Sequence, residues 1–446
     1  MSSRLIDRVR GAQQRYRADT QTDSAEFERY KKLLHNEIIG QIDYERVSKT
    51  PREELSRQLR KTLTQVVETR NLPLNRLERD RLVEEILDEI LGLGPLEPLL
   101  RDPAISDILI NGYDTIFIEK RGRLQKAEVK FNDNQHLMQI IDRIVSAVGR
   151  RVDETNPMVD ARLQDGSRFN AIIPPLALDG PVVSIRRFGT VPITAEDLIA
   201  YGSCPRPIIQ VLRGCVKAAL NIIISGGTGS GKTTLLNVMS SFIPTDERII
   251  TIEDAAELQL QQPHVVRLET RPPNLEGKGE VTARDLVKNS LRMRPDRIIL
   301  GEIRSAEAID MLQAMNTGHE GSLATVHSNT TRDALSRLET MIGMGMPNLT
   351  DKTIREMMAR ALDVVIQLDR LPDGTRRIMA VTEVLGMEGS IVTTQDIFRF
   401  NQKTMDDQGR IHGEFVATGT RPKFTARLKQ SGIHLSPELF RFKMEV

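Results

Sequence analysis

The chain has 446 residues, more than one hydrophobic core usually holds, so we expect roughly two to four domains. Its 62 Lys and Arg residues nearly balance its 61 Asp and Glu residues, which excludes an overall positive field that would attract nucleic acid or an anionic membrane. Two cysteines are too few for a disulfide scaffold or a four-thiolate zinc site, and no apolar run approaches the ~18 residues of a membrane span, so we expect a cytoplasmic protein.

Helical patterns dominate residues 24–94, after a polar stretch, residues 1–23, that we expect to be a flexible arm. Apolar residues recur at helical spacing in three segments, so three amphipathic helices are predicted to pack as a bundle. The segments carry Tyr30, Leu34, Ile38 and Ile42; Leu55, Leu59, Leu63 and Val66; and Val83, Ile86, Leu87 and Ile90. Glycines and prolines in "LGLGPLEPLL" end the third helix and put a domain boundary near residue 94.

An α+β domain is predicted for residues 95–188. "ISDILINGYDTIFIEKRGRLQKAEVKF" indicates strands and a hairpin, and "NQHLMQIIDRIVSAVG" a helix. "VDARLQDGSRFNAIIPP" predicts a second hairpin that turns at Asp165 and Gly166, and "VVSIRRF" predicts a last strand. Residues 189–205, which include Pro192 and Pro205, are predicted to be an interdomain linker.

The C-terminal segment, residues 206–446, alternates short β-rich runs with helical stretches. The runs are "NIIIS", "RIITI", "RIILG" and "SLATVH". This alternation is typical of an α/β domain, a parallel sheet with helices on both faces. "DVVIQLDRLPDGTRRIMAVTEVL" predicts a hairpin after that sheet, and the tail from residue 386 is mixed and polar.

A phosphate-binding loop follows the first of these strands. "GGTGSGKTT" completes the pattern G-x-x-x-x-G-K-[ST] between a strand and a helix, the context that the motif requires. Its glycines let backbone N–H groups turn onto a phosphate, while Lys232 reaches the β and γ phosphates of ATP and Thr233 binds Mg²⁺. The predicted nucleotide-binding residues are Gly226, Gly227, Thr228, Gly229, Ser230, Gly231, Lys232, Thr233 and Thr234. The alternative is a glycine-rich turn with a surface lysine.

Hydrolysis of ATP also needs a carboxylate near the γ phosphate. Because ligands bind at the carboxyl ends of parallel strands, Glu253, Asp254 and Glu302 are candidates. Asp296 starts its strand and is expected to be structural. Glu253, Asp254 and Glu257 have an alternative role as the acidic first turn of a helix.

Glu302 follows a buried apolar strand, where an acid without a function is costly. Gly301 occupies the position where many P-loop ATPases have an aspartate that orients magnesium through water. The magnesium shell is therefore expected to differ here, with Thr233 and Glu302 near the ion, directly or through water.

"GHEGSLATVHSN" holds His319 and His327, which could bind a metal or contact a phosphate. A structural zinc site needs four protein ligands, and His319, Glu320 and His327 offer three at most. We expect the loop before "SLATVH" and the end of that strand to face the phosphate edge, and therefore interpret both histidines as sensors of the nucleotide. Two buried core histidines remain the alternative.

Four motifs together resemble a known family. "GGTGSGKTT", "TIEDAAELQL", "RIILGEIR" and "GHEGSLATVHSN", in this order, are similar to the Walker A motif, Asp box, atypical Walker B motif and His box of the secretion-superfamily ATPases of type II and type IV secretion and type IV pili. "LLRDPAISDILINGYDTIFIEKRGRL", "DARLQDGSRFNAIIPP", "EVLGMEG" and "ATGTRPKF" resemble the CpaF-like branch, the motors of tight-adherence (Flp) pili. The resemblance covers nearly everything after residue 75, but the four-cysteine zinc insert of many type II relatives is absent.

This resemblance implies a multidomain ATPase, with a PAS-like α+β domain and a RecA-like ATPase domain, that works as a homo-hexamer. By match to the family's motifs, Lys232 and Thr233 bind ATP and Mg²⁺, Glu253 and Glu302 support hydrolysis, and His327 contacts phosphate. The implied partners are inner-membrane platform proteins of the pilus or secretion machine, on which the motor docks without entering the membrane.

Arginines cluster on adjoining strands of the α+β domain, at Arg162, Arg168, Arg186 and Arg187. Four guanidinium groups would repel one another unless an anion lies among them, and the alternative is a solvated face with salt bridges. Alternation sends Arg186 and Arg187 to opposite faces, so only one of that pair is expected to reach the nucleotide. We expect this domain to close over ATP and direct arginine charge at the γ phosphate.

Two other classes of function stay open. A nucleic-acid translocase could use the same motor core, but only 4% of the residues are aromatic and none is Trp, which leaves little for base stacking. A non-catalytic nucleotide switch would bind ATP and barely hydrolyse it, and Glu302 argues against that class.

Overall fold

The computed structural model describes residues 27, 29–31, 33–34, 52–70, 72–120, 122–187, 192–273 and 278–446. The predicted N-terminal arm lies outside these residues, as does most of the first predicted helix. The chain divides after residue 190 into two compact units, and each is described by itself.

Two helices of the first unit form a small apolar cluster. They are α3 (Arg52–Thr69) and α4 (Arg76–Leu91), and Leu63 and Val67 of α3 share the cluster with Leu82 and Ile86 of α4. Asn75 begins α4 through a reciprocal capping box with Glu78, and the helix ends before Gly92, as the sequence predicts. Phe27 and Leu34 are buried in the same cluster, so the described part of the first predicted helix contributes to it.

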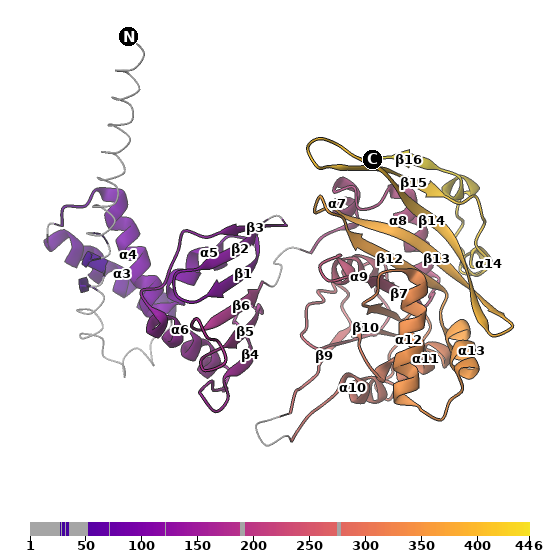
Figure 1. Ribbon diagram of the computed structural model, residues 1–446, viewed down its shortest axis with the longest axis horizontal. Helices are drawn as coiled ribbons and strands as arrows, with labels where there is room; N and C mark the ends of the chain where they lie inside the picture. Colours follow the sequence, from indigo (N-terminus) through magenta and orange to yellow (C-terminus); the bar gives the residue numbers. More distant parts are fainter. Residues whose placement is uncertain are drawn as a thin grey trace, which may run out of the picture. The chain divides into compact units, whose positions relative to one another are not determined.

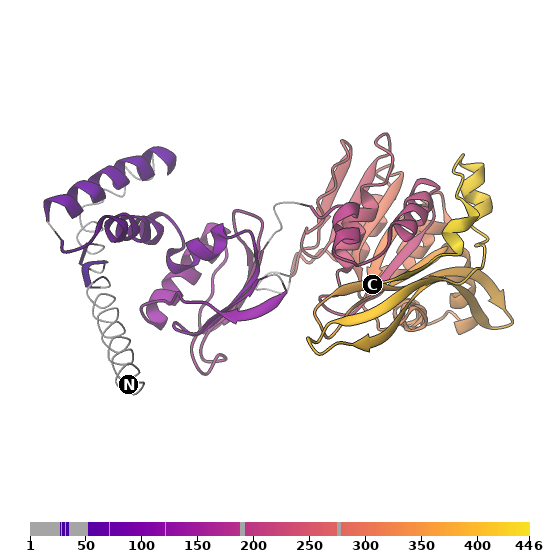
Figure 2. The same ribbon diagram turned by 90° about the horizontal axis from the view of Figure 1, so that it is seen from above.

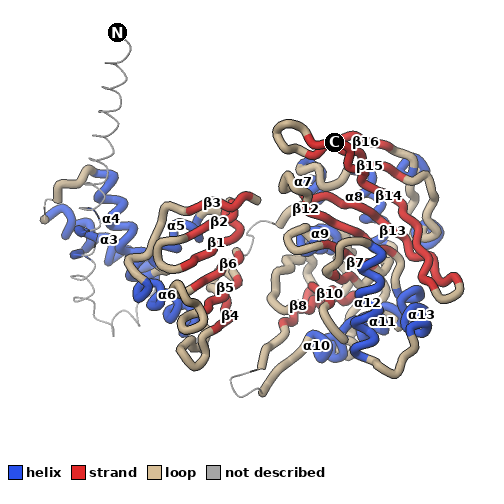
Figure 3. The backbone as a smooth tube through the Cα atoms, viewed as in Figure 1, coloured by secondary structure: helices blue, strands red, loops and turns tan. Residues whose placement is uncertain are grey.

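A six-stranded antiparallel sheet forms the rest of the first unit (Figures 1 and 3). The short helices η1 (Gly94–Leu96) and α5 (Glu97–Arg101) lead into it, and its strand order is β3-β2-β1-β6-β5-β4. The strands are β1 (Ile105–Asn111), β2 (Ile116–Lys120), β3 (Arg123–Lys126), β4 (Met158–Arg162), β5 (Arg168–Ile172) and β6 (Val182–Arg186). Leu137, Ile141 and Ile144 of helix α6 (Asn134–Ala147) pack on the sheet. The α+β prediction for this segment is confirmed, including the turn at Asp165 and Gly166.

The second unit is built on a ten-stranded sheet with the order β16-β15-β14-β13-β12-β7-β11-β10-β8-β9. Its parallel half consists of β7 (Ile222–Gly226), β8 (Ile249–Glu253), β9 (Val265–Glu269), β10 (Arg297–Ile303), β11 (Leu323–Val326) and β12 (Val364–Arg370). The antiparallel half consists of β13 (Arg376–Glu388), β14 (Ile391–Met405), β15 (Ile411–Ala417) and β16 (Lys443–Glu445). In Figure 2 the gold strands of residues 391–417 continue the sheet on one side.

Helices cover both faces of the parallel half. Ile222 and Ile224 of β7 belong to one hydrophobic core and Ile223 to the other, because successive strand residues point to opposite faces. The first core receives α7 (Ala195–Ala200), α8 (Arg206–Lys217), α9 (Lys232–Ser240), α14 (Thr425–Gln430) and η2 (Pro437–Phe440). The second receives α10 (Ala283–Ser290), α11 (Glu307–Asn316), α12 (Thr331–Gly345) and α13 (Asp351–Ala361), the orange group in Figure 1. The predicted α/β architecture is confirmed.

Two boundaries predicted for this unit are wrong. Residues 192–205 are not only a linker, because Leu198 of α7 and Cys204 are buried in the first core. The hairpin predicted to follow the sheet is instead part of it, since β12 pairs with β7, and the polar tail contains the long strands β14 and β15.

No helix follows β8 directly, so the alternative role of Glu253, Asp254 and Glu257 as a helical first turn is also wrong. None of the described helices has the length and apolar character to cross a membrane.

Candidate active site

Five parallel strands bring their carboxyl ends to one edge of the sheet. In the register, Ile224 of β7 lies beside Thr325 of β11 and Ile366 of β12, and Ile299 of β10 lies beside Thr251 of β8. Residues that directly follow these strands therefore meet at the same edge, which is where ligands bind in open α/β sheets.

The glycine-rich loop follows β7 at this edge and turns into α9. Gly229 and Gly231 have φ values of +71° and +96°, which residues with a side chain rarely adopt. A side chain at Gly226 would meet the Leu368 carbonyl of β12, since a Cβ there would lie 2.7 Å from that oxygen. The glycines are thus required by backbone conformation at the loop's apex and by close strand packing at its start.

Lys232 is enclosed by this loop. Its Nζ donates hydrogen bonds to the carbonyl oxygens of Gly226 (2.9 Å) and Gly227 (3.0 Å), and the Ser230 hydroxyl donates to Gly227 O as well (2.9 Å). The ammonium therefore lies at the N-terminus of α9, where a helix favours anions. The ammonium group and the helix N-terminus both suit the negative charge of a phosphate chain. The Thr233 hydroxyl, on the first turn of α9, is of the oxygen type that Mg²⁺ prefers.

Glu253, the last residue of β8, is buried with one unsatisfied carboxylate oxygen. Its Oε2 accepts hydrogen bonds from the backbone N–H groups of Glu257 (2.7 Å) and Leu258 (2.9 Å), while Oε1 has no hydrogen-bond partner. Burial raises the pKa of Glu253 to about 7, although the two N–H donors favour the ionised form. A carboxyl with this pKa can accept a proton near neutral pH.

Gly301 of β10 lies against Glu253. A Cβ at position 301 would come within 2.9 Å of Glu253 Cγ, closer than such atoms approach. The side chain of Glu253 therefore occupies the space that an aspartate at position 301 would need. An aspartate at position 301 would therefore require Glu253 to move.

Glu302 is held by a neighbouring arginine. Arg304, directly after β10, donates from Nε to Glu302 Oε2 (2.6 Å) and from Nη1 to Asp254 Oδ2 (2.6 Å). Glu302 keeps a side-chain exposure of 24%, so solvent reaches it at the edge of the sheet. The pairing neutralises part of the negative charge that two acids would otherwise concentrate beside the loop.

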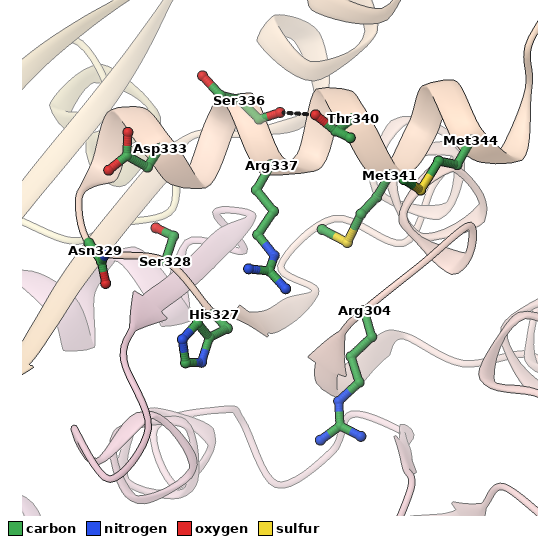
Figure 4. Close-up of a pocket in the computed structure, with 10 residues that line it drawn as sticks. All are labelled: Arg304, His327, Ser328, Asn329, Asp333, Ser336, Arg337, Thr340, Met341 and Met344. Carbon is green, nitrogen blue, oxygen red and sulfur yellow. Dashed lines mark hydrogen bonds between the residues drawn. The ribbon is translucent and has the colours of Figure 1, made fainter.

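His327 directly follows β11 and lines a pocket of about 630 Å³ (Figure 4). Figure 4 shows Arg337 extending from α12 toward the level of the His327 ring, and Arg304 beside them with its guanidinium directed away from α12. The pocket is also lined by Ser328, Asn329, Asp333, Ser336, Thr340, Met341 and Met344. His327 thus lies at the predicted edge, beside cationic groups suited to anions.

His319 lies at the opposite end of the sheet, so the expectation that both histidines face the phosphate edge is wrong. It precedes β11, and its carbonyl accepts a hydrogen bond from Ser322 Oγ (2.8 Å). The same loop is bonded to Asn221, at the start of β7. Because β11 spans about 10 Å between the two histidines, they cannot share a metal ion.

Asp296 is also at the amino edge, before β10, where its Oδ2 accepts the backbone N–H of Arg248 (2.6 Å). It has the structural role that its position in the sequence predicts. Its hydrogen bond joins the start of β10 to the start of β8.

Three of the four arginines of the first unit are aligned. In the sheet register Arg168 is directly opposite both Arg162 and Arg186, and directly opposite residues point to the same face. Arg187 differs, since its guanidinium donates to the carbonyl oxygens of Asp102 and Ile105. Arg162, Arg168 and Arg186 therefore form a row, whereas Arg187 supports the loop before β1. The side chains of Arg186 and Arg187 thus have different surroundings, as alternation along the strand predicts.

Sequence reasoning missed three arginines at the carboxyl edge of the sheet. Arg304 follows the same strand as Glu302 and could have been found by applying the strand-end rule to basic residues. Arg370 and Arg376 flank the loop at Gly229, but the hairpin that carries them was expected outside the sheet.

Comparisons with known proteins agree on one family. The family model described as "Type II/IV secretion system protein" matches residues 89–413, and the model of the type II secretion system protein E N-terminal domain matches residues 27–91. A putative conjugal transfer protein of Mycobacterium tuberculosis is 35% identical over 330 residues, which cover 73% of this chain and 93% of that protein. The type IV secretion system protein VirB11 of Brucella suis is 30% identical, with coverages of 64% and 87%.

Solved structures give weaker similarities. The crystal structure of the VirB11 ATPase from Brucella suis shares 29% identity and covers 64% of this chain and 91% of its own, with a TM-score of 0.35. The pilus retraction motor PilT with bound ADP shares 21% identity and covers 64% and 80%, with a TM-score of 0.47.

Proposed function

We propose a mechanical role for this chain, which belongs to the family of type II/IV secretion system proteins and is an ATPase of that family. One observation carries the proposal. Lys232, Glu253 and Glu302 reach the same sheet edge from three different strands or their following loops, within the segment that the family model matches. This is the arrangement that phosphoryl transfer to water needs: a charge to hold the phosphates and carboxylates beside it.

We assign each residue a step in hydrolysis. Backbone N–H groups from Gly227 to Thr234, with the Lys232 ammonium, bind the phosphates of ATP. Thr233 and Glu302 would hold Mg²⁺, directly or through water, and a bound ion would supply positive charge beside the phosphates. Glu253 accepts the proton of the attacking water through its unpartnered Oε1, and His327 contacts the phosphate at the end of β11.

The aligned arginines of the first unit complete this proposal. Arg162, Arg168 and Arg186 form a row of like charges, which the ion pair of Arg168 with Asp160 (3.9 Å) offsets in part. We propose that the row supplies positive charge to the γ phosphate when this unit closes on ATP within a homo-hexamer. Hydrolysis would then release the arginines and change the position of the unit, which converts chemical energy into motion.

The finer assignment is a motor that assembles or retracts a tight-adherence (Flp) pilus, docked from the cytoplasm on inner-membrane platform proteins. It is supported by the CpaF-like segments, which extend from residue 99 to residue 424. The near balance of charge supports protein partners over nucleic acid.

A type IV secretion ATPase is the second candidate, because relatives at 30–35% identity carry the names VirB11 and conjugal transfer protein. It uses the same active site and differs in the machine that the motor drives.

Complementation of a strain that lacks this chain tests the motor proposal. We expect Glu302→Gln to keep ATP binding but lose at least about a hundredfold in turnover, and to leave the cells without surface pili. Glu280→Gln, an exposed residue in the loop before α10, is the matched control and should restore pili. Pili at wild-type number with the inactive variant would contradict the pilus assignment. Native mass spectrometry with ATP should show six copies, and a monomer at all protein concentrations would contradict the ring.

A further inference from the structure

Two arginines flank the phosphate-binding loop on the side away from the carboxylates. Arg370 ends β12 and Arg376 begins β13, and the two are directly paired across this hairpin. Their guanidinium groups therefore leave the same face of the sheet side by side. Neither residue belongs to the motifs or to the arginine row discussed above.

The hairpin that carries them is rigid. Leu371 N and Thr375 O are hydrogen-bonded across the turn (2.8 Å), and Leu371 is buried in the first core. Asp373 accepts the backbone N–H of Thr375 (2.9 Å) with one oxygen and that of Ile411 (2.9 Å) on β15 with the other. The turn is thus fixed from two sides, which holds the two arginines in place before any ligand binds.

Both side chains reach the apex of the loop. Arg376 Nε donates to the carbonyl of Gly229 (2.8 Å), and its Cδ would lie 3.5 Å from a Cβ at Gly231. Arg370 Nη1 would lie 3.5 Å from a Cβ at Gly229. With Lys232, three cationic side chains therefore surround one short loop.

The strand order indicates which end of a bound nucleotide these charges would face. β7 has β11, β10 and β8 on one side, where Glu302 and Glu253 lie, and β12 and β13 on the other. The bond that hydrolysis breaks joins the β and γ phosphates, so the carboxylates mark the γ end of the nucleotide. The arginines accordingly face the end that carries the nucleoside.

We propose that Arg370 and Arg376 bind the nucleotide at its α-phosphate, the part that ATP and ADP share, and so set nucleotide affinity rather than the rate of hydrolysis. Guanidinium groups suit this role because they make charge-assisted hydrogen bonds to phosphate oxygens. The inference rests on the proposed function in one respect, namely that the nucleotide binds at this loop.

Calorimetric titration of the full chain with ADP and with ATPγS tests the inference. We expect Arg370→Ala and Arg376→Ala each to weaken both nucleotides by the same factor, about tenfold, since a charge-assisted hydrogen bond is lost. At saturating ATP their kcat should stay within about threefold of the wild type, while KM rises. Arg399→Ala, at an exposed arginine of β14 that pairs with Asp396, is the control and should change neither value.

Arg376→Ala also removes a hydrogen bond to the loop, so Arg370→Lys is included. The lysine keeps the positive charge and should recover part of the affinity that Arg370→Ala loses, which a merely loosened loop would not do. Unchanged ADP affinity in both alanine variants would overturn the inference, as would a loss confined to ATPγS, which indicates a contact to the γ phosphate. If the wild-type chain binds no nucleotide, the proposed function fails as well; if it binds and the variants match it, only this inference fails.

Discussion

Among the site residues, Glu253 lies in the environment least typical of a carboxyl group. The fold buries a carboxyl group at the end of β8, satisfies one of its oxygens with two backbone donors and leaves the other without a partner. Burial raises its pKa to about 7, so at neutral pH about half of the molecules hold it ionised. A group with this pKa is suited to take a proton from water and to lose it again.

This pKa predicts a pH dependence of activity. Only ionised Glu253 can accept a proton, so turnover should rise with pH, with a midpoint near 7. Glu253→Gln should lower turnover by at least about a hundredfold and remove that rise. The measurement is kcat of both forms from pH 6 to pH 9, and an unchanged profile in the variant would remove Glu253 from the proton transfer.

The same pKa predicts an effect on stability. Because the folded pKa lies above the ordinary value of 4.5, folding favours the protonated acid, and that stabilisation is lost as pH rises from about 4.5 to 7. Glu253→Gln carries no charge to bury, so it should be more stable than the wild type at pH 8, by about 1–3 kcal/mol, and gain little at pH 5. Calorimetric melting at both pH values measures this difference. A difference that does not change with pH would contradict the assignment of the pKa.

Single residues were predictable where a strand fixed their position. Glu253, Glu302 and His327 each follow a short apolar run, so the rule about carboxyl ends located them. His319 was misplaced because the loop that connects a helix to the next parallel strand returns to the amino edge. Arg304 also follows a strand, but a basic residue at a strand end does not by itself indicate a catalytic role.

At the scale of elements, α7 shows how a sequence can hide a structural boundary. Pro192 and Pro205 bracket a stretch that looks like a linker, yet Thr194 caps α7 through a capping box with Asp197, and Leu198 is buried. The segment therefore belongs to the second unit, and its burial is expected to stabilise that unit by about 2–4 kcal/mol.

Truncation tests this boundary. A chain of residues 192–446 should melt at a clearly higher temperature than one of residues 206–446, which lacks Leu198 and Cys204 of the core. The Leu198→Ala variant of the longer chain should fall between the two. Equal melting temperatures for the two truncated chains would show that α7 adds nothing to the unit.

The antiparallel half of the large sheet was harder to predict than the parallel half. Buried on both faces, β7 and β8 are continuous apolar runs that stand out in the sequence. β14 has only three buried positions, without a regular alternation, and ends in five exposed residues, so its composition resembles that of a loop. Because this half of the sheet was not predicted, the position of Arg370 and Arg376 was not predicted either. Their position depends on the pairing of β12 with β7.

At the scale of the whole molecule, we propose that both units contribute residues to hydrolysis. The second unit holds the phosphate-binding loop and the carboxylates, and the first holds the row of Arg162, Arg168 and Arg186. Arg187 serves as a comparison that distinguishes a specific role of the row from the general effect of removing an arginine. It adjoins the row in sequence but is hydrogen-bonded to the carbonyls of Asp102 and Ile105.

Alanine substitution of Arg186 and of Arg187 should therefore affect different properties, activity in the first case and stability in the second. Arg186→Ala should lower kcat by at least about tenfold and leave the melting temperature unchanged, since its side chain is exposed. Arg187→Ala should lower the melting temperature by several degrees, because two part-buried carbonyl groups lose a donor. Phosphate release and calorimetry on both variants decide the matter. If Arg187→Ala alone reduces kcat while stability is kept, the assignment of the pair is reversed.

Phosphate release by the full chain, compared with its Lys232→Ala variant, tests the central claim that ATP is hydrolysed at the carboxyl edge of the large sheet. We expect steady release by the wild type with Mg²⁺ and ATP, and a loss of at least about a hundredfold in Lys232→Ala at an unchanged melting temperature, because the charge that holds the phosphates is removed. Lys217→Ala, an exposed lysine in the last turn of α8, should release phosphate like the wild type. Release by Lys232→Ala at the wild-type rate would contradict the claim and place the hydrolysis site elsewhere.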